Sequence, residues 1–134
     1  MVIGGENSPR DVEIVDFNGN SECSKPKDLP VDFEYGVGTL YKGRPLICGG
    51  IGQKGCYTYY FESNSWEFLG DLPQNRVASA AVMLNTKDWW ITGGGLVSGL
   101  SGETYDSTLE YGGFSFVEGP DLPYARKYHC LVQV

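Results

Sequence analysis

The chain has 134 residues, of which 41% are hydrophobic and 20% charged, and its formal net charge is −7. This length is typical of one domain with a modest core. Because Lys and Arg form no cluster, nucleic acid and anionic membrane surfaces are not expected as partners. No apolar run reaches the roughly 18 residues that a membrane span needs, so no membrane-spanning segment is expected.

Glycine and aromatic residues are the unusual part of the composition. The chain contains 19 Gly, 3 Trp, 9 Tyr and 6 Phe. This mixture favours many short strands joined by tight turns. The first ten residues lack the charged region and the long apolar stretch of a signal peptide. The chain instead opens inside a repeat unit, which we interpret as part of a longer protein.

The predicted strands fall into three units and one extra strand. In the first unit, residues 1–30, strands are expected at Met1–Gly5 and Asp11–Phe17, and a polar segment follows. The inventory for this unit is three strands, with the first strand of the pattern missing. In the second unit, residues 31–73, the turns at Gly43–Pro45 and Asn64–Ser65 separate four expected strands. These are Glu34–Lys42, Leu46–Gly50, Cys56–Glu62 and Trp66–Leu69.

The third unit, residues 74–123, repeats this order with a longer loop at Leu96–Glu103. Its expected strands are Val77–Leu84, Asp88–Thr92, Thr104–Tyr111 and Phe114–Glu118. Residues Arg126–Val134 match a further first strand. Short strands bounded by Gly, Pro and Asn are typical of an all-β domain.

One pattern returns in all three units: an apolar pair, a glycine doublet and, further on, a Leu-Pro pair. The doublets lie 45 and 44 residues apart, and the Leu-Pro pairs lie 43 and 50 apart. A repeat of this length in an all-β chain predicts four-stranded propeller blades. The doublets are Gly4-Gly5, Gly49-Gly50 and Gly93-Gly94, and the Leu-Pro pairs begin at Leu29, Leu72 and Leu122.

This sequence pattern resembles the kelch repeat. The resemblance rests on the doublets, on Tyr57 after the second doublet, on Trp66 nine residues later, and on Leu-Pro-x-x-Arg ending at Arg76 and Arg126. It covers essentially the whole chain and implies a kelch-type β-propeller segment of about three blades. The bulky aromatics are expected in the core, and the two arginines are expected to form structural hydrogen bonds between blades.

The first unit departs from this pattern, because Phe17 stands where a Trp is usual and residues 32–35 contain no Arg. The third unit departs as well, with Phe114 or Phe116 in the place of the Trp.

A propeller of this family implies a non-catalytic scaffold that binds protein partners through its loops, with no cofactor and no metal. The candidate binding residues lie in loops Ile51–Gly55 and Leu96–Glu103; they are Ile51, Gln53, Lys54, Leu96, Val97 and Leu100. The sequences within the repeats are also similar to those of kelch-type proteins of invertebrate animals, many of which are extracellular. The compartment is left open, with an extracellular location favoured over a cytoplasmic one. A purely architectural segment is a third interpretation.

An enzymatic alternative rests on Tyr128 and His129, which resemble the Tyr-His copper ligands of the galactose oxidase family. That family uses a kelch-type propeller and needs several N and O ligands around copper. His129 is the only histidine of the chain. Adjacent residues of a strand face opposite sides, which argues against a shared pocket for this pair.

The four cysteines have no CxxC spacing, and three full pairings are open. Buried free thiols on strands are one interpretation, and a scaffold with one or two disulfides is the other. Cys48 and Cys56 flank a seven-residue connection between neighbouring strands, so they are the expected pair if a disulfide forms. Cys23 and Cys130 lie in different blades and are expected to be free.

The terminal strands carry the last expectation. Tyr128–Gln133 is expected to pair with Met1–Gly5, within one chain or between two. A homodimer and further blades in a longer chain are the two routes to a complete propeller.

Overall fold

The computed structural model describes residues 1–15, 25–85, 88–96, 102–113 and 115–133. The described residues form strands and irregular segments, and they include no helix long and apolar enough to cross a membrane. The strands are β1 (Val2–Ile3), β2 (Val12–Glu13), β3 (Val37–Tyr41), β4 (Arg44–Cys48), β5 (Gly55–Tyr60), β6 (Ser65–Asp71), β7 (Ala80–Met83), β8 (Trp89–Thr92), β9 (Thr108–Tyr111) and β10 (Phe116–Glu118).

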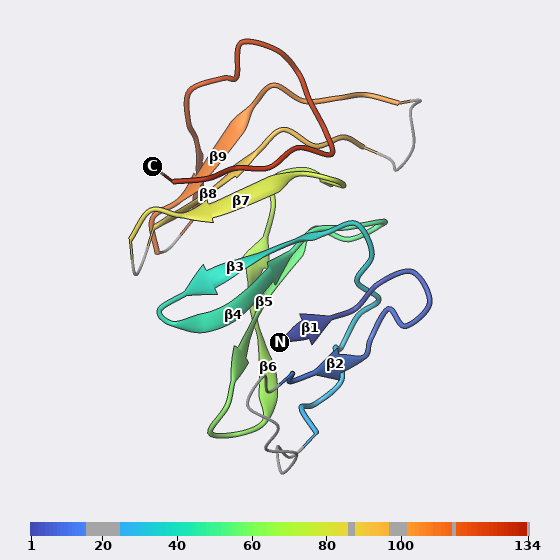
Figure 1. Ribbon diagram of the computed structural model, residues 1–134. Coiled ribbons are helices and arrows are strands. Elements are labelled where there is room, and N and C mark those ends of the chain that lie inside the picture. The colour runs from blue at the N-terminus through green and yellow to red at the C-terminus, as the bar shows by residue number, and fades with distance from the viewer. Residues whose placement is uncertain (16–24, 86–87, 97–101, 114, 134) are drawn as a thin grey trace.

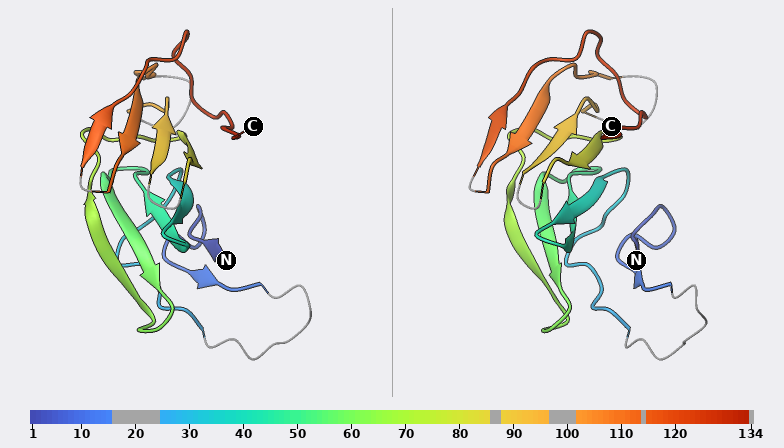
Figure 2. Two further views of the ribbon diagram at one scale, coloured as in Figure 1. Left: turned by 90° about the vertical axis from the view of Figure 1, so that its left-hand side faces the viewer. Right: turned by 60° about the vertical axis from the view of Figure 1, so that its left-hand side comes forward.

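The described strands form three sheets, and within each sheet consecutive strands pair antiparallel. The first sheet is β1-β2, the second is β3-β4-β5-β6 and the third is β7-β8-β9-β10. β3 lies next to β7, so the first strands of the second and third sheets are adjacent. The sheets follow one another along an open arc, and both chain ends lie on its concave side (Figures 1 and 2). The fold is therefore the expected all-β arrangement of blades, and the ring is not closed.

The glycine doublet makes the same backbone contact in all three sheets. Gly50 N donates to the carbonyl oxygen of Arg76 at 3.0 Å, and Gly94 N donates to that of Arg126 at 2.8 Å. In the first sheet, Gly5 N donates to Phe33 O at 3.1 Å. Each doublet is thereby tied to the segment that follows the next Leu-Pro pair.

The first glycine of a doublet has a left-handed backbone that a side chain would strain. Gly49 has φ +67, and a Cβ built on it would lie 2.7 Å from Arg76 O. Gly4 and Gly93 have the same conformation, with φ of +61 and +59. Only glycine combines this φ with so close an approach of a neighbouring carbonyl. The doublets are therefore required where consecutive sheets meet.

Two apolar clusters fill the space between the sheets. Trp89, Ile91 and Tyr111 of the third sheet pack with buried residues of the second, among them Leu46 and Leu72. Between the first and second sheets lies a smaller cluster of Val12, Leu29 and Ile47, with Ile3, Phe33, Tyr57 and Trp66 packed against it.

The same position of the sheets carries three chemically different cross-strand pairs. The pair is Ile3 and Val12 in the first sheet, Cys48 and Cys56 in the second, and Thr92 and Thr108 in the third. Cys48 and Cys56 are joined by a disulfide, with Cα atoms 4.1 Å apart, and both are buried.

Two expectations about local structure were wrong. The turn between β3 and β4 is Lys42-Gly43 rather than Gly43–Pro45. Lys42 and Gly43 both have positive φ, at 50 and 76, and Tyr41 pairs with Arg44. This two-residue geometry matches the right-handed twist of the flanking strands, so Arg44 and Pro45 belong to β4.

The second error concerns the C-terminal segment. Residues 126–133 form no strand, and β1 pairs only with β2 within the described residues. The expected pairing of Tyr128–Gln133 with Met1–Gly5 is therefore not formed within the chain. Residues 130–133 form no strand because no described strand lies beside them to pair with, whereas β3 and β7 are each paired with the second strand of their own sheet.

Candidate functional site

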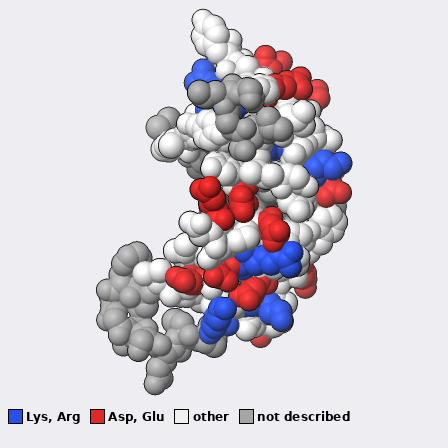
Figure 3. Space-filling view, turned by 90° about the vertical axis from the view of Figure 1, so that its right-hand side faces the viewer, with Lys and Arg blue, Asp and Glu red and all other residues white. Residues whose placement is uncertain are grey.

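The connections between sheets and the loops after the doublets meet at one end of the molecule. Hydrogen bonds join them: Ile51 N donates to Glu34 O at 3.0 Å, and Asn75 Nδ2 donates to Leu96 O at 3.4 Å. We call this end the loop face; it comprises the described parts of residues 5–10, 31–36, 49–55, 73–79, 95–103 and 123–129. Figure 3 looks onto it and shows Asp and Glu side chains over its middle, and Lys and Arg side chains interspersed with Asp and Glu in its lower half.

Three residues with left-handed backbone lie in a row on the loop face. Tyr35, Ala78 and Tyr128 have φ of 54, 55 and 57. Ala78 N donates to Tyr35 O, and Tyr128 N donates to Ala78 O, both at 2.8 Å. The rings of Tyr35 and Tyr128 meet edge to face with centroids 6.5 Å apart. Positive φ is uncommon outside glycine and persists where the surroundings hold it; here the backbone ladder does so.

Large apolar side chains on the loop face are turned toward solvent. Tyr124 is the most exposed, at 75%. The others are Tyr35, Ile51, Leu96 and Tyr128. Exposed aromatic groups on a rigid backbone suit protein recognition, because they supply contact area at small entropic cost.

Four of the six loop residues expected from the sequence can be placed. Ile51, Lys54 and Leu96 are exposed, and Gln53 is half-buried. Their backbones are anchored: Gln53 N donates to Gly50 O at 3.2 Å, and Lys54 O accepts from Leu72 N at 2.8 Å. Val97 and Leu100 lie outside the described residues.

Arg76 is the most buried charged group among the described residues, at 1% exposure. Its guanidinium donates to Gly93 O at 2.6 Å, to Ser107 O at 3.1 Å and to Ser107 Oγ at 2.6 Å. It also lies 5.1 Å from the ring centroid of Tyr105. Burial lowers the pKa of Arg76 from its ordinary value, and Tyr105 opposes this change.

The effect of this guanidinium is structural. It binds the carbonyl of the doublet residue Gly93 and the segment before β9, both in the third sheet. The carbonyl of Arg76 accepts from Gly50 of the second sheet. Arg76 therefore connects two sheets, with its side chain on one and its backbone on the other.

Arg126 has a different environment. Its carbonyl receives Gly94 N, as that of Arg76 receives Gly50 N, but its side chain is exposed. The Arg126 guanidinium donates only to Tyr124 O among the described contacts, at 3.3 Å.

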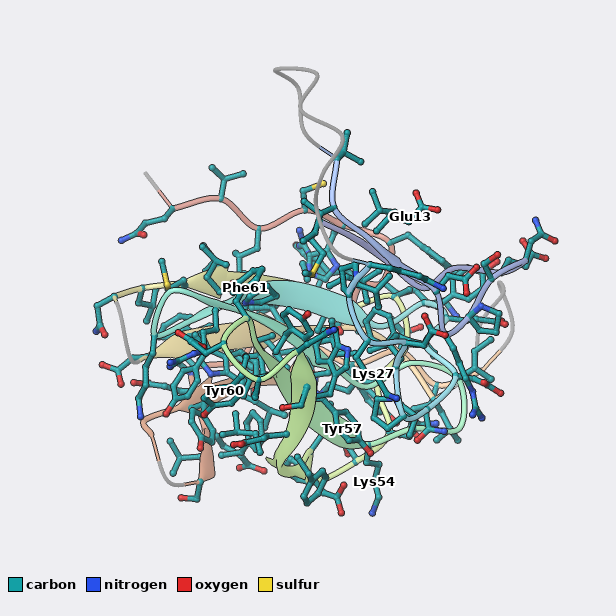
Figure 4. The ribbon with its side chains drawn as sticks, turned by 90° about the horizontal axis from the view of Figure 1, so that it is seen from below. Glu13, Lys27, Lys54, Tyr57, Tyr60 and Phe61 are labelled. Atoms are coloured by element: carbon teal, nitrogen blue, oxygen red, sulfur yellow. A yellow bond between two sulfur atoms is a disulfide. The ribbon has the colours of Figure 1, made fainter. Side chains whose placement is uncertain are left out.

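Tyr57 and Trp66 lie at the interface between the first and second sheets rather than on the loop face. Tyr57 contacts Phe68 with ring centroids 5.5 Å apart. Trp66 Nε1 donates to the carbonyl of Lys27 at 2.9 Å, which attaches the polar segment of the first unit to β6. Figure 4 shows Tyr57 and Lys27 from below.

Tyr128 and His129 do not form one pocket. Tyr128 is exposed beside Tyr35, whereas His129 is half-buried with Nε2 2.8 Å from Thr92 Oγ1. Burial, followed by the nearby Arg126 charge, lowers the pKa of His129. Nδ1 of His129 is buried without a hydrogen-bond partner. Across the described residues, no group of three His, Cys, Asp or Glu side chains is arranged to hold a metal ion.

The row of Tyr35, Ala78 and Tyr128 was missed from the sequence. A signal was available, since each residue follows the proline of a Leu-Pro pair by five positions. The same spacing places Phe33 at the position of Arg76 and Arg126. Neither composition nor hydrophobic alternation marks these residues, because their roles come from backbone conformation.

Comparison with protein-family models finds no match, and comparison with curated proteins finds none. Solved structures do match. One of them, described as the structure of YjhT, aligns with a TM-score of 0.63 and 13% identity. The alignment covers 75% of this chain and 40% of that one, so the chain spans less than half of its structural neighbour. At this identity the likeness shows the fold alone: the chain is an all-β protein whose antiparallel sheets are arranged as an unclosed segment of propeller blades.

Proposed function

We propose that the chain is a kelch-type propeller segment that acts as a non-catalytic scaffold and binds a protein partner with its loop face. The observation that carries this proposal is the row of Tyr35, Ala78 and Tyr128, which holds exposed aromatic groups on hydrogen-bonded backbone. A preordered surface binds with a smaller loss of conformational entropy. The kelch assignment is supported by the three doublets, which make one repeated contact with the segment after each Leu-Pro pair.

Charge on the loop face is mixed in sign, although the chain carries a net charge of −7. Its acidic residues are Glu6, Asp32, Glu34 and Glu103, and its basic residues outside the core are Arg10, Lys54, Arg126 and Lys127. Asp32 is paired with Arg10. A partner surface with charges of both signs around an apolar centre would complement this face.

Site-specific photo-cross-linking tests the proposal. A benzophenone amino acid replaces Tyr35 or Tyr124 on the loop face, and as a matched control it replaces Val117 of β10, which is exposed elsewhere. In an extract of the cells that make the protein, we expect the first two positions to capture the same protein, and Val117 to capture none of it. Equal capture at all three positions, or none at any, would contradict a loop-face partner.

Metal content distinguishes the copper oxidase alternative from the scaffold proposal. His129 already contacts Thr92, and Tyr128 points to solvent. We expect no stoichiometric copper after refolding with the ion. Tight copper binding that disappears in His129→Gln would overturn the scaffold proposal.

A further inference from the structure

A cavity of about 560 Å³ lies where the first unit meets the second sheet. Residues 27–30 of the first unit form one wall, and the beginning of β6 forms another. The volume is within the range of about 300–1,000 Å³ that is typical of small-molecule sites. The lining residues used here are Arg10, Lys27, Asp28, Leu29, Ser65 and Trp66. Except for Arg10, they lie outside the loop face.

A smaller cavity, of about 330 Å³, occupies the corresponding position at the next junction. Counted back from the Leu-Pro pairs, Asp71 corresponds to Asp28, and Phe116 corresponds to Trp66. Both Asp71 and Phe116 line the smaller cavity, and a glycine takes the place of Lys27 there. A cavity at this position is therefore a feature of the junction between units. The first junction has the larger one, with an indole ring and basic side chains in its lining.

Hydrogen bonds hold the lining of the larger cavity in place. Trp66 Nε1 donates to the carbonyl oxygen of Lys27 at 2.9 Å, and Lys27 N donates to Asn64 Oδ1 at 2.6 Å. Tyr59 OH donates to the same oxygen of Asn64 at 2.7 Å. The indole ring and the backbone beside it are therefore fixed before a ligand arrives, which reduces the entropic cost of binding.

The lining combines an apolar part with polar groups that donate and accept. Leu29 is buried, and the half-buried Trp66 packs against its cluster. Asp28 can accept hydrogen bonds, and Arg10 and Lys27 can donate them. The Asp28 carboxylate would repel an anion, and the basic side chains would repel a cation. A ring with apolar C–H faces and hydroxyl groups at its edge fits this lining, because each hydroxyl both donates and accepts.

Two of the charged side chains in the lining are already paired with neighbours. Asp28 Oδ1 lies 3.2 Å from Lys25 Nζ, and Arg10 is paired with Asp32. Both pairs are exposed, so each contributes little energy and its members remain able to bind other polar groups. A ligand of this cavity therefore gains more from hydrogen bonds than from a charge of its own.

We infer that this cavity binds a neutral saccharide. The apolar face of one sugar ring packs against the Trp66 indole, and the hydroxyl groups of the ring bind Asp28 and Lys27. The cavity at the next junction is smaller and lacks the indole and the lysine, so it does not bind the same ligand. The site is separate from the loop face and does not depend on a protein partner there.

An oligosaccharide array tests the class of ligand. The panel contains neutral oligosaccharides of glucose, galactose, mannose and N-acetylglucosamine, and acidic ones that carry carboxylate or sulfate groups. We expect the protein to bind at least one neutral member, and Asp28→Asn to bind it about tenfold more weakly, because a charged acceptor is lost. Asp71→Asn is the matched control and should bind it as the wild type does. Both aspartates are exposed, so neither substitution disturbs the core.

NMR spectroscopy locates the bound sugar. Adding the neutral oligosaccharide selected on the array should shift the indole N–H signal of Trp66 and leave that of Trp89, on β8, unchanged. Trp66→Phe should weaken binding by about tenfold or more, because the ring offers less contact area. A shift at Trp89 without one at Trp66, or equal binding by Asp28→Asn and Asp71→Asn, would overturn the inference. Binding confined to acidic members of the panel, or to none of its members, would also overturn it.

Discussion

Arg76 and Arg126 end two copies of the same Leu-Pro-x-x-Arg segment, and only one of them is buried. Both carbonyls accept a hydrogen bond from the second glycine of the preceding doublet. The Arg76 side chain reaches acceptors of the following sheet, at Gly93 and Ser107, whereas the Arg126 side chain donates to Tyr124 O, two residues away. Among the described residues, no such sheet follows Arg126.

The difference separates two sets of contacts in the repeat, which we call the backbone layer and the side-chain layer. The backbone layer depends on the preceding sheet and recurs at every junction, even where Phe33 replaces the arginine. The side-chain layer depends on the following sheet and forms where that sheet is present. The motif therefore specifies the junction through its backbone, and the arginine locks the next blade onto it.

The largest effect is expected from removing the buried arginine. Arg76→Met should lower the free energy of unfolding by about 3–5 kcal/mol, because Gly93 O and the Ser107 groups would lose charged donors in a buried site. Arg126→Met is the matched control and should change it by less than about 0.5 kcal/mol. Urea unfolding followed by tryptophan fluorescence measures both. Equal losses for the two variants would remove the distinction between the layers.

The backbone layer can be broken at Gly49. Gly49→Ala should cost about 2–3 kcal/mol, because a left-handed alanine is strained by about 1–2 kcal/mol and its Cβ would also press on Arg76 O. Gly52 has nearly the same φ, +68, but open space around its Cα. Gly52→Ala should therefore cost only about 1 kcal/mol. Thermal unfolding of both variants separates strain from contact, and indistinguishable values would show that the Arg76 carbonyl contact contributes nothing.

The second sheet has a disulfide where the third sheet has the pair Thr92 and Thr108, and its contribution to stability can be measured. Cys48 and Cys56 are eight residues apart, a loop for which chain entropy predicts about 2.5 kcal/mol. Replacing both by Ala should lower stability by about that amount, whereas Cys130→Ala should be neutral. Denaturant unfolding with and without reductant is the measurement. A wild-type protein that reductant does not destabilise would contradict it.

The smallest effect concerns the pH dependence of the C-terminal segment. The folded-state pKa of His129 lies below its ordinary value of 6.5, owing to burial and to Arg126. The folded state therefore binds a proton less readily than the unfolded state, and the contribution is fully present above pH 6.5. It is lost as the pH falls through the lower folded-state pKa. Stability curves from pH 8 to 5 should fall more for the wild type than for His129→Gln, and parallel curves would contradict this.

The repeat made much of the fold predictable. The doublets and the Leu-Pro pairs indicated blades because their spacing survives changes in the side chains between them. Strand positions in the second and third sheets followed from alternation and turn residues, and the Cys48–Cys56 pair followed from strand adjacency. The Lys42-Gly43 turn was missed, because a positive φ at Lys42 has no signature in residue type.

The candidate site was only partly predictable. Exposure at Ile51 and Leu96 agrees with loop positions after the doublets. Tyr35 and Tyr128 had no such marker, because each is distinguished by left-handed backbone and by neighbours 93 positions apart in the chain. Contacts between residues so distant in sequence leave no local pattern to detect.

The sequence by itself determined the strand class, the repeat period and the places where glycine is required, since these depend on local backbone geometry and on hydrophobic alternation. Only the tertiary structure decided which Leu-Pro-x-x-Arg arginine is buried and whether residues 130–133 form a strand. Each outcome depends on a neighbouring sheet that supplies hydrogen-bond acceptors or a ladder partner. A segment carries its propensity in its own residues, whereas its partners come from elsewhere in the fold.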